Sequence, residues 1–343
     1  MIKDYCIKDG KIKTYTYILL IILPILCSIF ALSIGRMNFK VGDIFNLFLD
    51  LISKTNLDPM LESVVINIRL PRILTALIVG SGLTCAGIAF QALFSNPLAT
   101  PDILGVTSAS SLGAIIGILL SKNTMEIQVF SLLMGLFSIF ITLKLVKEAR
   151  TSMIMLVLSG LIMSSLANAF SSLLKYTADP TDKLPQITYW LMGFFGRASY
   201  KNLILASPMI ILSIIFIYKM RWRLNILSLS EDEARSLGIN VKRTRLSFIL
   251  ASTIITASSV SLCGQIGWIG LIIPHIARML VGANNIYTLP FGISIGAGLM
   301  VIIEALSRTI SVIELPISIL TAIIGAPIFI VLLRQTGGKF RWI

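Results

Sequence analysis

Charge, histidine and metal-binding patterns are scarce in this 343-residue sequence. Charged residues make up 13% of the chain, against about a quarter in an average soluble domain. His275 is the only histidine, and the four cysteines have no metal-ligand spacing. The sequence contains no Gly-x4-Gly-Lys-Ser/Thr phosphate loop, paired nucleophile and base, or cluster of histidine and aspartate. We therefore expect no catalytic residue, metal site or bound cofactor in this chain.

Long apolar runs fill most of the sequence instead. Apolar residues make up 56% of the chain, and the mean hydropathy is +0.90. A membrane-spanning helix takes about 20 mostly apolar residues, whereas a lipid-exposed isolated strand leaves its backbone polar groups unpaired. We predict an all-α integral membrane protein with about ten transmembrane helices. The predicted spans are 15–35, 72–92, 104–120, 127–145, 153–174, 203–218, 246–263, 266–281, 289–307 and 317–333, of which the second, third and eighth are interrupted or short.

The net charge of +13 reflects membrane orientation better than nucleic-acid binding. Lysine and arginine lie between the apolar spans and are not interleaved with stacking aromatic residues. The positive-inside rule places both ends of the chain, 1–14 and 334–343, in the cytoplasm together with the basic loop 219–245. The sequence predicts one transmembrane domain over 1–343, surrounded by lipid, with no nucleic-acid partner.

A polar, proline-bounded turn follows the second predicted span. Asn96 precedes Pro97, and Pro101-Asp102 precedes Gly105. Proline removes a backbone donor and disfavours helix at the residue before it. Asp102 is placed to cap the following span or to supply an acid to its first turn. Two interpretations remain open, a tight turn between helices and the inner lining of a pathway, because irregular backbone is tolerated at membrane depth where it lines a cavity.

Three arginines lie at predicted outer span ends, against the positive-inside bias: Arg69, Arg72 and Arg308. Lipid phosphate groups are one explanation. For Arg308 another is an ion pair with Glu304, four residues earlier on the same predicted helix. Glu304 is the one acid well inside a predicted span, where a charge costs about 2.5–3.5 kcal/mol, so it needs a partner or a function.

The cytoplasmic loop 219–245 contains the pattern of a short helix. In Ser230–Glu233 a serine precedes glutamate by three residues, which is a capping box, and three acids fall in the first turn. Gly238 supplies a helix stop, and Ala234 and Leu237 are predicted to form a small apolar face. The pattern fits either a solvated loop helix or a docking helix for a cytoplasmic partner.

Four segments of the chain together resemble one family, the permease subunits of ABC importers for iron chelates and vitamin B12 (FecCD/BtuC-like, type II importers). They are 69–105, which begins with Arg69-Leu-Pro-Arg72; 231–238; 264–278, which reads Gly-Gln-Ile-Gly-Trp-Ile-Gly-Leu-Ile-Ile-Pro-His-Ile-Ala-Arg; and 314–327, with Glu-Leu-Pro and Gly-Ala-Pro at its ends. The likeness runs from about residue 14 to 334. Trp268 stands where the family usually has phenylalanine, and Glu304 where aspartate is common.

The resemblance implies a BtuC-like permease fold with inverted halves, made by spans two to five and seven to ten. It implies a subunit in the cytoplasmic membrane of a prokaryote that moves a ferric siderophore inward, or alternatively haem or cobalamin. ATP and Mg would be bound by a separate cytoplasmic ATPase dimer. The other implied partners are an extracytoplasmic substrate-binding protein and a second permease copy or paralogue.

Site residues follow in four groups. The resemblance implies an ATPase-coupling group and a binding-protein docking group, the polar turn suggests a pathway group, and the helical spacing suggests a structural ion pair. An ion-coupled secondary transporter is the competing class, but it would normally need several buried acids and only Glu304 qualifies. The groups are: coupling, Glu231, Ala234, Arg235, Leu237 and Gly238; docking, Arg69, Arg72 and Arg308; pathway and gate, Asn96, Pro97, Leu98, Thr100, Pro101, Thr151 and Ser152; ion pair, Glu304 and Arg308.

Overall fold

The computed structural model describes residues 5–8, 10–53, 58–145 and 153–335. The predicted gate residues Thr151 and Ser152 lie outside these ranges. The described chain is helical except for turns, links and one two-stranded antiparallel sheet, formed by β1 (Ile7–Lys8) and β2 (Lys11–Ile12).

Seven helices in the described part of the chain are long and apolar enough to cross a membrane. They are α2 (Thr14–Ser33), the continuous Pro59–Leu93, α7 (Thr124–Leu145), α8 (Met153–Thr177), α10 (Tyr200–Lys219), α13 (Val241–Cys263) and α15 (Asn285–Thr309). The Pro59–Leu93 stretch consists of α4 (Pro59–Glu62), the π-helix η1 (Ser63–Arg69) and α5 (Leu70–Leu93). The predicted helical membrane class is confirmed.

Three further apolar helices are shorter. They are α6 (Val106–Leu120), α14 (Ile269–Val281) and α16 (Ile317–Gln335). Each of the ten predicted segments falls on one of these ten helices, and the third and eighth, expected to be short, are α6 and α14. Because three of the helices fall outside the seven candidate spans, the count of ten spans stays a prediction.

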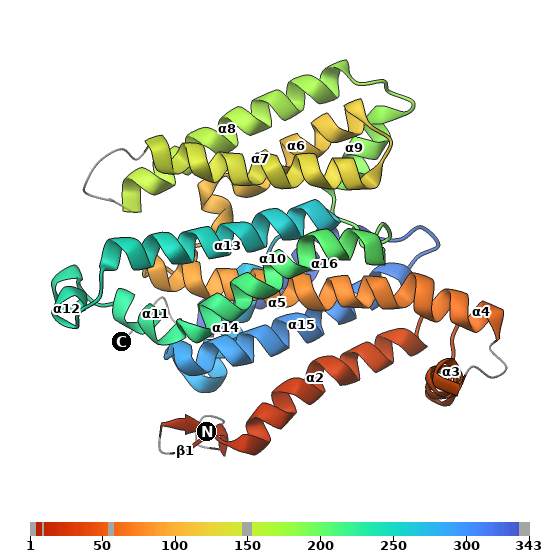
Figure 1. Ribbon diagram of the computed structural model, residues 1–343, viewed down its shortest axis with the longest axis horizontal. Coiled ribbons are helices and arrows are strands. Elements are labelled where there is room, and N and C mark those ends of the chain that lie inside the picture. Colours follow the sequence, from red (N-terminus) through yellow and green to blue (C-terminus); the bar gives the residue numbers. More distant parts are fainter. Residues whose placement is uncertain (1–4, 9, 54–57, 146–152, 336–343) are drawn as a thin grey trace.

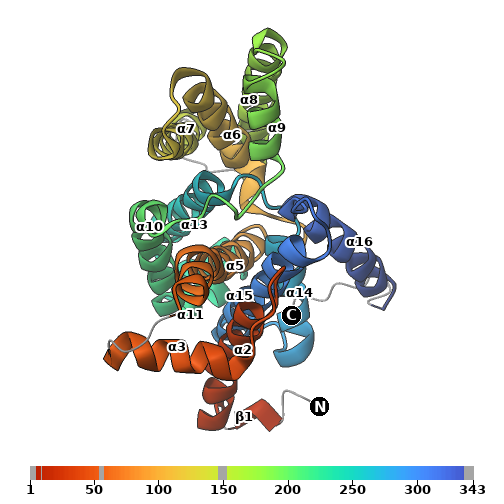
Figure 2. The same cartoon turned by 90° about the vertical axis from the view of Figure 1, so that its right-hand side faces the viewer.

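Short elements lie at the two ends of the bundle. In Figure 1, β1, α11 (Arg221–Leu227) and α12 (Glu231–Ser236) lie at the left end, whereas α3 (Val41–Ser53), α4 and α9 (Lys183–Leu191) lie at the right. Figures 1 and 2 show that α3 runs across the direction of the long helices. Its buried residues are Ile44 and Leu47, so α3 buries one face only.

Helix α5 lies at the centre and contacts α10, α13, α14 and α15. Glycine allows these contacts to be close. A Cβ on Gly80 would lie 2.3 Å from the carbonyl oxygen of Gly296, and a Cβ on Gly87 would lie 2.0 Å from that of Gly270. These glycines therefore let α5 approach α14 and α15 closely.

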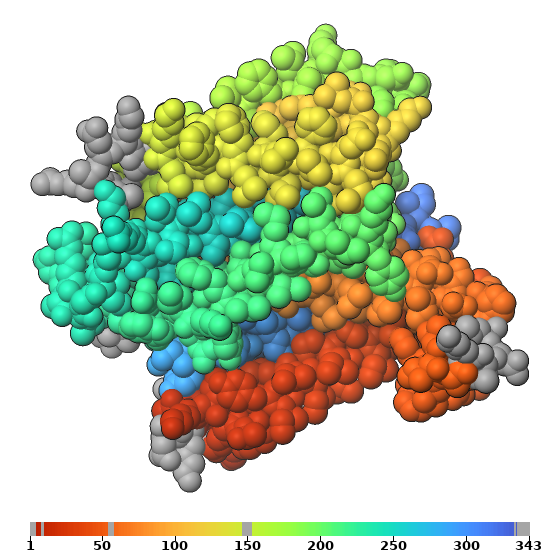
Figure 3. Space-filling view, viewed as in Figure 1, coloured from red at the N-terminus to blue at the C-terminus, as the bar shows by residue number. Residues whose placement is uncertain are grey.

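The outer helices expose apolar side chains. Only 17% of the apolar window of α2 and 22% of that of α8 is buried, against 72% or more for α5, α13 and α15. Figure 3 shows α2 in red along one edge of the molecule, and the layer of α6, α7 and α8 at the opposite edge. Lipid chains are the surroundings that such apolar faces require.

In each of two sets of four helices, a long helix is followed by a shorter helix and then by another long one. Helices α5 to α8 have 24, 15, 22 and 25 residues, and α13 to α16 have 23, 13, 25 and 19. Gly105 and Gly264, with φ of 78° and 76°, lie between the first and second helix of each set. In Figure 1, α5 begins at the end that carries α4, and α13 begins at the opposite end, beside α12. This arrangement agrees with the inverted halves that the family resemblance implies.

Candidate functional site

The three outer arginines come together at the end of the bundle that carries α3 and α4. Arg69 ends η1, Arg72 lies in the first turn of α5, and Arg308 lies in the last turn of α15. Only 3%, 5% and 6% of their respective surfaces are exposed. A buried guanidinium needs paired partners, and in this structure the partners are protein groups.

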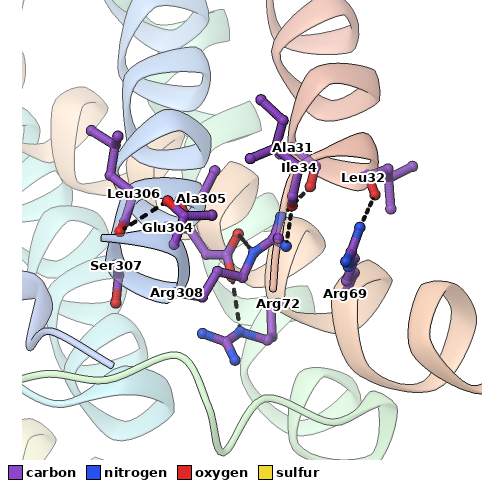
Figure 4. Close-up of polar contacts among 12 residues, drawn as sticks. Ala31, Leu32, Ile34, Arg69, Arg72, Glu304, Ala305, Leu306, Ser307 and Arg308 are labelled. Carbon is purple, nitrogen blue, oxygen red and sulfur yellow. Dashed lines mark hydrogen bonds and ion pairs between the residues drawn. The ribbon is translucent and has the colours of Figure 1, made fainter. Parts of the chain in front are cut away.

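Glu304 is the centre of this arginine cluster. It is completely buried, and each carboxylate oxygen pairs with a different arginine. Oε1 lies 2.8 Å from Nε of Arg72, and Oε2 lies 3.1 Å from Nε of Arg308 (Figure 4). The ion pair with Arg308 follows from helical spacing, whereas the pair with Arg72 joins α15 to α5 and no sequence spacing indicates it.

Glu314 is a second carboxylate that the sequence analysis did not assign to the site. It lies in the link between α15 and α16, and its side chain is 23% exposed. Its two oxygens accept hydrogen bonds of 3.0 and 2.9 Å from Nη1 and Nη2 of Arg72. This two-point geometry is the strongest form of arginine–carboxylate pairing. The ring of Phe194 lies 5.9 Å from the same guanidinium.

Backbone carbonyls at the end of α2 bind the remaining guanidinium nitrogens. Arg308 donates to the carbonyls of Ala31 and Ile34, and Arg69 donates to those of Leu32 and Met37. The last carbonyls of a helix have no partner within the helix and carry its negative dipole end. The arginines therefore satisfy the end of α2 and attach it to α5 and α15.

Gly35 leaves room for two of these guanidiniums. A Cβ at this position would lie 2.4 Å from Nη2 of Arg69 and 2.8 Å from Nη1 of Arg308. These two nitrogens donate hydrogen bonds to the carbonyls of Met37 and Ile34, so they cannot move away without losing these bonds. A larger residue is therefore incompatible with this arrangement of the cluster.

A cavity of about 250 Å³ opens beside the arginine cluster. Its wall includes four arginines, Arg36, Arg69, Arg72 and Arg308, and one carboxylate, Glu314. The excess of guanidinium groups makes this a favourable site for an anion, and carboxylates match the planar fork of arginine.

The opposite end of the molecule presents α12. Ser230 and Glu233 form the predicted capping box: the serine hydroxyl accepts from the Glu233 amide at 3.4 Å, and the glutamate carboxylate accepts from the Ser230 amide at 3.0 Å. The Ser230 hydroxyl also donates to the Glu233 carboxylate at 2.6 Å, and this bond, together with the one from the Ser230 amide, holds the pKa of Glu233 below its usual value. The helix ends at Gly238, whose φ is +76°. The predicted capping box and glycine stop are both confirmed.

The predicted apolar face of this short helix is wrong. Ala234 is 1% exposed and packs inward, whereas Leu237 is 58% exposed. Leu237 lies at the C-cap, where the chain leaves the helix, so it does not continue the face of Ala234. Glu231 and Arg235 pair at 2.9 Å with more than half of each side chain exposed. Of the predicted coupling residues, Glu231, Arg235 and Leu237 are thus available to a partner.

The polar turn after α5 interrupts the helical backbone, as its prolines and polar residues predict. The side chain of Asn96 accepts a 2.9 Å hydrogen bond from the Leu98 amide, and Leu98 is 52% exposed. Pro101 begins a short 3-10 helix, η2 (Pro101–Leu104). Asp102 lies in this turn and accepts from the Thr107 hydroxyl, while Gly105 is the N-cap of α6. The expectation that Asp102 caps α6 is wrong, because η2 intervenes.

A small cavity of about 30 Å³ lies between the polar turn after α5 and the segment that joins α13 to α14. Thr100, Pro101 and Asp102 from the turn line it, together with Gly264 and Trp268 from that segment. A cavity of this size holds a water molecule or two. Other predicted pathway positions, Asn96 and Leu98, lie nearby in the chain and point to solvent or lipid.

An apolar helical bundle with a buried arginine cluster at one end and an exposed, capped helix at the other is the architecture of a membrane transport subunit. Comparison with known proteins identifies which kind. The FecCD transport family matches residues 20–335. The molybdate import permease MolB of Haemophilus influenzae is 40% identical, over 92% of this chain and 94% of its own. An iron chelatin transport permease of Helicobacter pylori is 35% identical, over 81% and 84% respectively.

A solved structure described as an inward-facing metal-chelate type ABC transporter superposes with a TM-score of 0.85. It shares 37% identity and matches 94% of this chain and all of its own. The chain belongs to the FecCD transport family, as its resemblance to that family indicates, and is a multi-pass membrane permease of the ABC importer type.

Proposed function

We propose that this protein forms the membrane pathway of an importer that brings a metal chelate, a ferric siderophore in the first instance, into the cytoplasm. ATP and Mg are handled by a separate ATPase dimer in the cytoplasm, and a second permease copy or paralogue completes the pathway. The observation that carries this proposal is the contrast between the two ends of the molecule. A cavity walled by four arginines lies at one end, and the exposed helix α12 lies at the other.

The outer end is proposed as the docking site for the substrate-binding protein. Arg69, Arg72 and Arg308 would receive acidic side chains of that protein through the arginine-lined cavity. Their burial supports a precise geometry, because a guanidinium fixed by internal partners loses little freedom when a further carboxylate arrives. It also means that only a side chain that enters the cavity can reach them.

The inner end is proposed as the site of ATPase coupling. Glu231, Arg235 and Leu237 would contact the ATPase, whereas Ala234 would fix α12 to the permease core and Gly238 would set its end. A buried anchor with an exposed outer surface suits a helix that passes force between two subunits. A cysteine crosslink to the ATPase is accordingly expected from Leu237→Cys and not from Ala234→Cys.

The pathway is proposed to lie between two permease copies, with the turn Asn96–Asp102 near its inner end. Leu98, at 52% exposed, is the test position within that turn. Leu98→Cys should change its reactivity toward a soluble thiol reagent when the ATPase binds ATP. Equal reactivity in all nucleotide states would count against a pathway role for this turn.

The identity of the cargo is the most specific part of the proposal. An iron chelate is favoured by the iron chelatin and metal-chelate relatives. A molybdate-type oxyanion is the second candidate, because a molybdate permease shares 40% identity over nearly the whole chain. Haem and cobalamin stay open as alternatives, since relatives are named for hemin and vitamin B12 transport.

Uptake into proteoliposomes tests the function and the cargo together. The protein is reconstituted with the ATPase and the binding protein encoded beside it, and radiolabelled ferric siderophore and molybdate are offered in parallel. We expect uptake of one cargo that requires internal ATP and survives ionophores that collapse ion gradients. Uptake that needs a gradient and no ATP would instead identify an ion-coupled secondary transporter.

A further inference from the structure

Two carboxylates pair with the guanidinium of Arg72, and they differ in burial, in position in the fold and in the number of arginines that they bind. Glu304 lies inside α15 with no exposed surface, and both of its oxygens are committed to different arginines. Glu314 lies outside any helix, its side chain is 23% exposed, and both of its oxygens bind Arg72 alone. Removal of Glu304 disrupts two ion pairs, whereas removal of Glu314 disrupts one.

Glu314 occupies the edge of Arg72 that an external carboxylate would need. Glu304 pairs with Nε of Arg72, which leaves Nη1 and Nη2 for another carboxylate. Glu314, which lies in the wall of the arginine-lined cavity, accepts hydrogen bonds from both of these nitrogens. An incoming carboxylate therefore finds its best site already taken by a carboxylate of the same chain.

The charge of the cluster favours exchange at this site over departure of Glu314 without a replacement. The cavity wall carries Arg36, Arg69, Arg72 and Arg308 against Glu314, with Glu304 buried behind them. If Glu314 left without a replacement, the remaining guanidiniums would repel one another more strongly. If another carboxylate entered as Glu314 left, the charge and the two hydrogen bonds of Arg72 would be kept.

We propose that Glu314 is an exchangeable occupant of Arg72, and that a carboxylate of an acidic protein partner takes its place and releases residues 310–316 from α5. This inference rests on the proposed function for its partner, the substrate-binding protein at the outer end. In the free permease Glu314 keeps the fork of Arg72 paired, and in the docked complex it is displaced.

Release of the link 310–316 affects contacts with other parts of the fold. Residues 310–316 join α15 to α16, and the Arg36 side chain donates to the Val312 carbonyl. Directly after the link, the amide of Ile317 donates to the carbonyl of Gly193 at 2.9 Å. Exchange at Arg72 thus changes the attachment of the start of α16, one of the shorter helices, to the remainder of the permease.

Amide hydrogen exchange of the full chain in lipid nanodiscs tests this inference without the importer partners. The probe is poly-L-glutamate, with poly-L-lysine at equal ionic strength as the control polymer. We expect poly-L-glutamate to raise the exchange of residues 310–316 in the wild type by about five- to tenfold, which corresponds to a local opening made easier by roughly 1–1.4 kcal/mol. Glu314→Gln should show that faster exchange already, with no further rise on addition of the polymer.

Glu126→Gln, an exposed acid at the start of α7, is the matched control and should behave as the wild type. The inference is overturned if poly-L-glutamate leaves residues 310–316 unchanged, if poly-L-lysine acts equally, or if Glu314→Gln exchanges at the wild-type rate. The first outcome would mean that Glu314 is a fixed occupant of Arg72, the second that the effect is not specific to carboxylates, and the third that Glu314 does not hold the link.

Affinity for the substrate-binding protein separates this inference from the proposed function. Since Glu314 competes with the partner, Glu314→Gln should bind it about three- to tenfold more tightly. Weaker binding would overturn the inference, because Glu314 would then assist docking. If poly-L-glutamate releases the link but no binding protein docks on the wild type, the exchange of carboxylates stands and the proposed docking partner is wrong.

Discussion

Replacement of Glu304 by glutamine is the most direct test of the arginine cluster. The change keeps the size of the side chain and removes its charge, so that Arg72 and Arg308 each lose an ion pair of 2.8 and 3.1 Å in a fully buried site. Loss of one partner of a buried ion pair typically costs about 3–5 kcal/mol, because the remaining charge stays buried. Arg72 keeps Glu314, and Arg308 keeps two backbone carbonyls. We therefore expect the lower end, about 3 kcal/mol.

The measurement is the free energy of unfolding in bicelles or mixed micelles. A loss of about 3 kcal/mol raises the unfolding equilibrium constant by roughly a hundredfold, since each 1.4 kcal/mol is a factor of ten. Glu304→Asp keeps the charge and should lose far less. The double variant Glu304→Gln/Arg308→Gln should lose less stability than the two single variants lose together, because it removes both members of the ion pair and leaves no unpaired Arg308 charge.

The exposed residue Glu126 provides the control, and Glu126→Gln should change stability by no more than about 0.5 kcal/mol. If Glu304→Gln falls within the same limit, then Glu304 does not support the two guanidiniums, and the electrostatic account of the cluster is refuted. If the double variant is simply additive, the two residues do not act as a pair.

Three further predictions concern helix packing and the coupling helix. Gly87→Ala should destabilise the fold by about 1–3 kcal/mol, because its Cβ would lie 2.0 Å from the backbone oxygen of Gly270; Gly267→Ala, with nothing within 4 Å, is the control in the same unfolding assay. Gly238→Ala meets no neighbour but must adopt φ of +76°, so it should cost about 1–2 kcal/mol, seen as faster amide exchange in α12 with unchanged exchange elsewhere. The lowered pKa of Glu233 stabilises α12 fully above the usual glutamate value of 4.5, and this contribution is lost as the pH falls through the lower folded value. A spin label near α12 should therefore become mobile only well below pH 4.5, and Glu233→Gln should remove that transition.

Local features of this protein could be predicted from the sequence because their causes are local. Apolar runs of helical length place the spans, and all ten predicted segments fall on apolar helices. The capping box at Ser230 and the stop at Gly238 depend on residues three to eight positions apart, and both are present. The glycines of α5 are visible in the sequence, but their partners on α14 and α15 could not be named from it.

The tertiary contacts could not be predicted from the sequence because they join segments that lie far apart in the chain. No regular spacing in the sequence connects Arg72 with Glu304. Glu314 lies in a short link between helices, where no periodic pattern indicates its partner. The arginines were predicted at the ends of spans, but their burial was not predicted, because it depends on the end of α2 and on the α15–α16 link, which supply their partners. The burial of Ala234 has the same origin, since its inward contacts come from neighbouring elements and not from its own short helix.

The order in which the cluster's members occur in the chain has a consequence for biogenesis. Arg69 and Arg72 belong to an early hydrophobic segment, whereas Glu304 and Glu314 belong to the last two apolar helices and the link between them. During synthesis Arg72 is inserted before either of its carboxylate partners has been made. Its ion pairs form only when α15 and the link after it arrive, so they join an early part of the chain to a late one. A polypeptide that stops before α15 therefore retains an uncompensated cation at a membrane-spanning helix, which is costly in a bilayer.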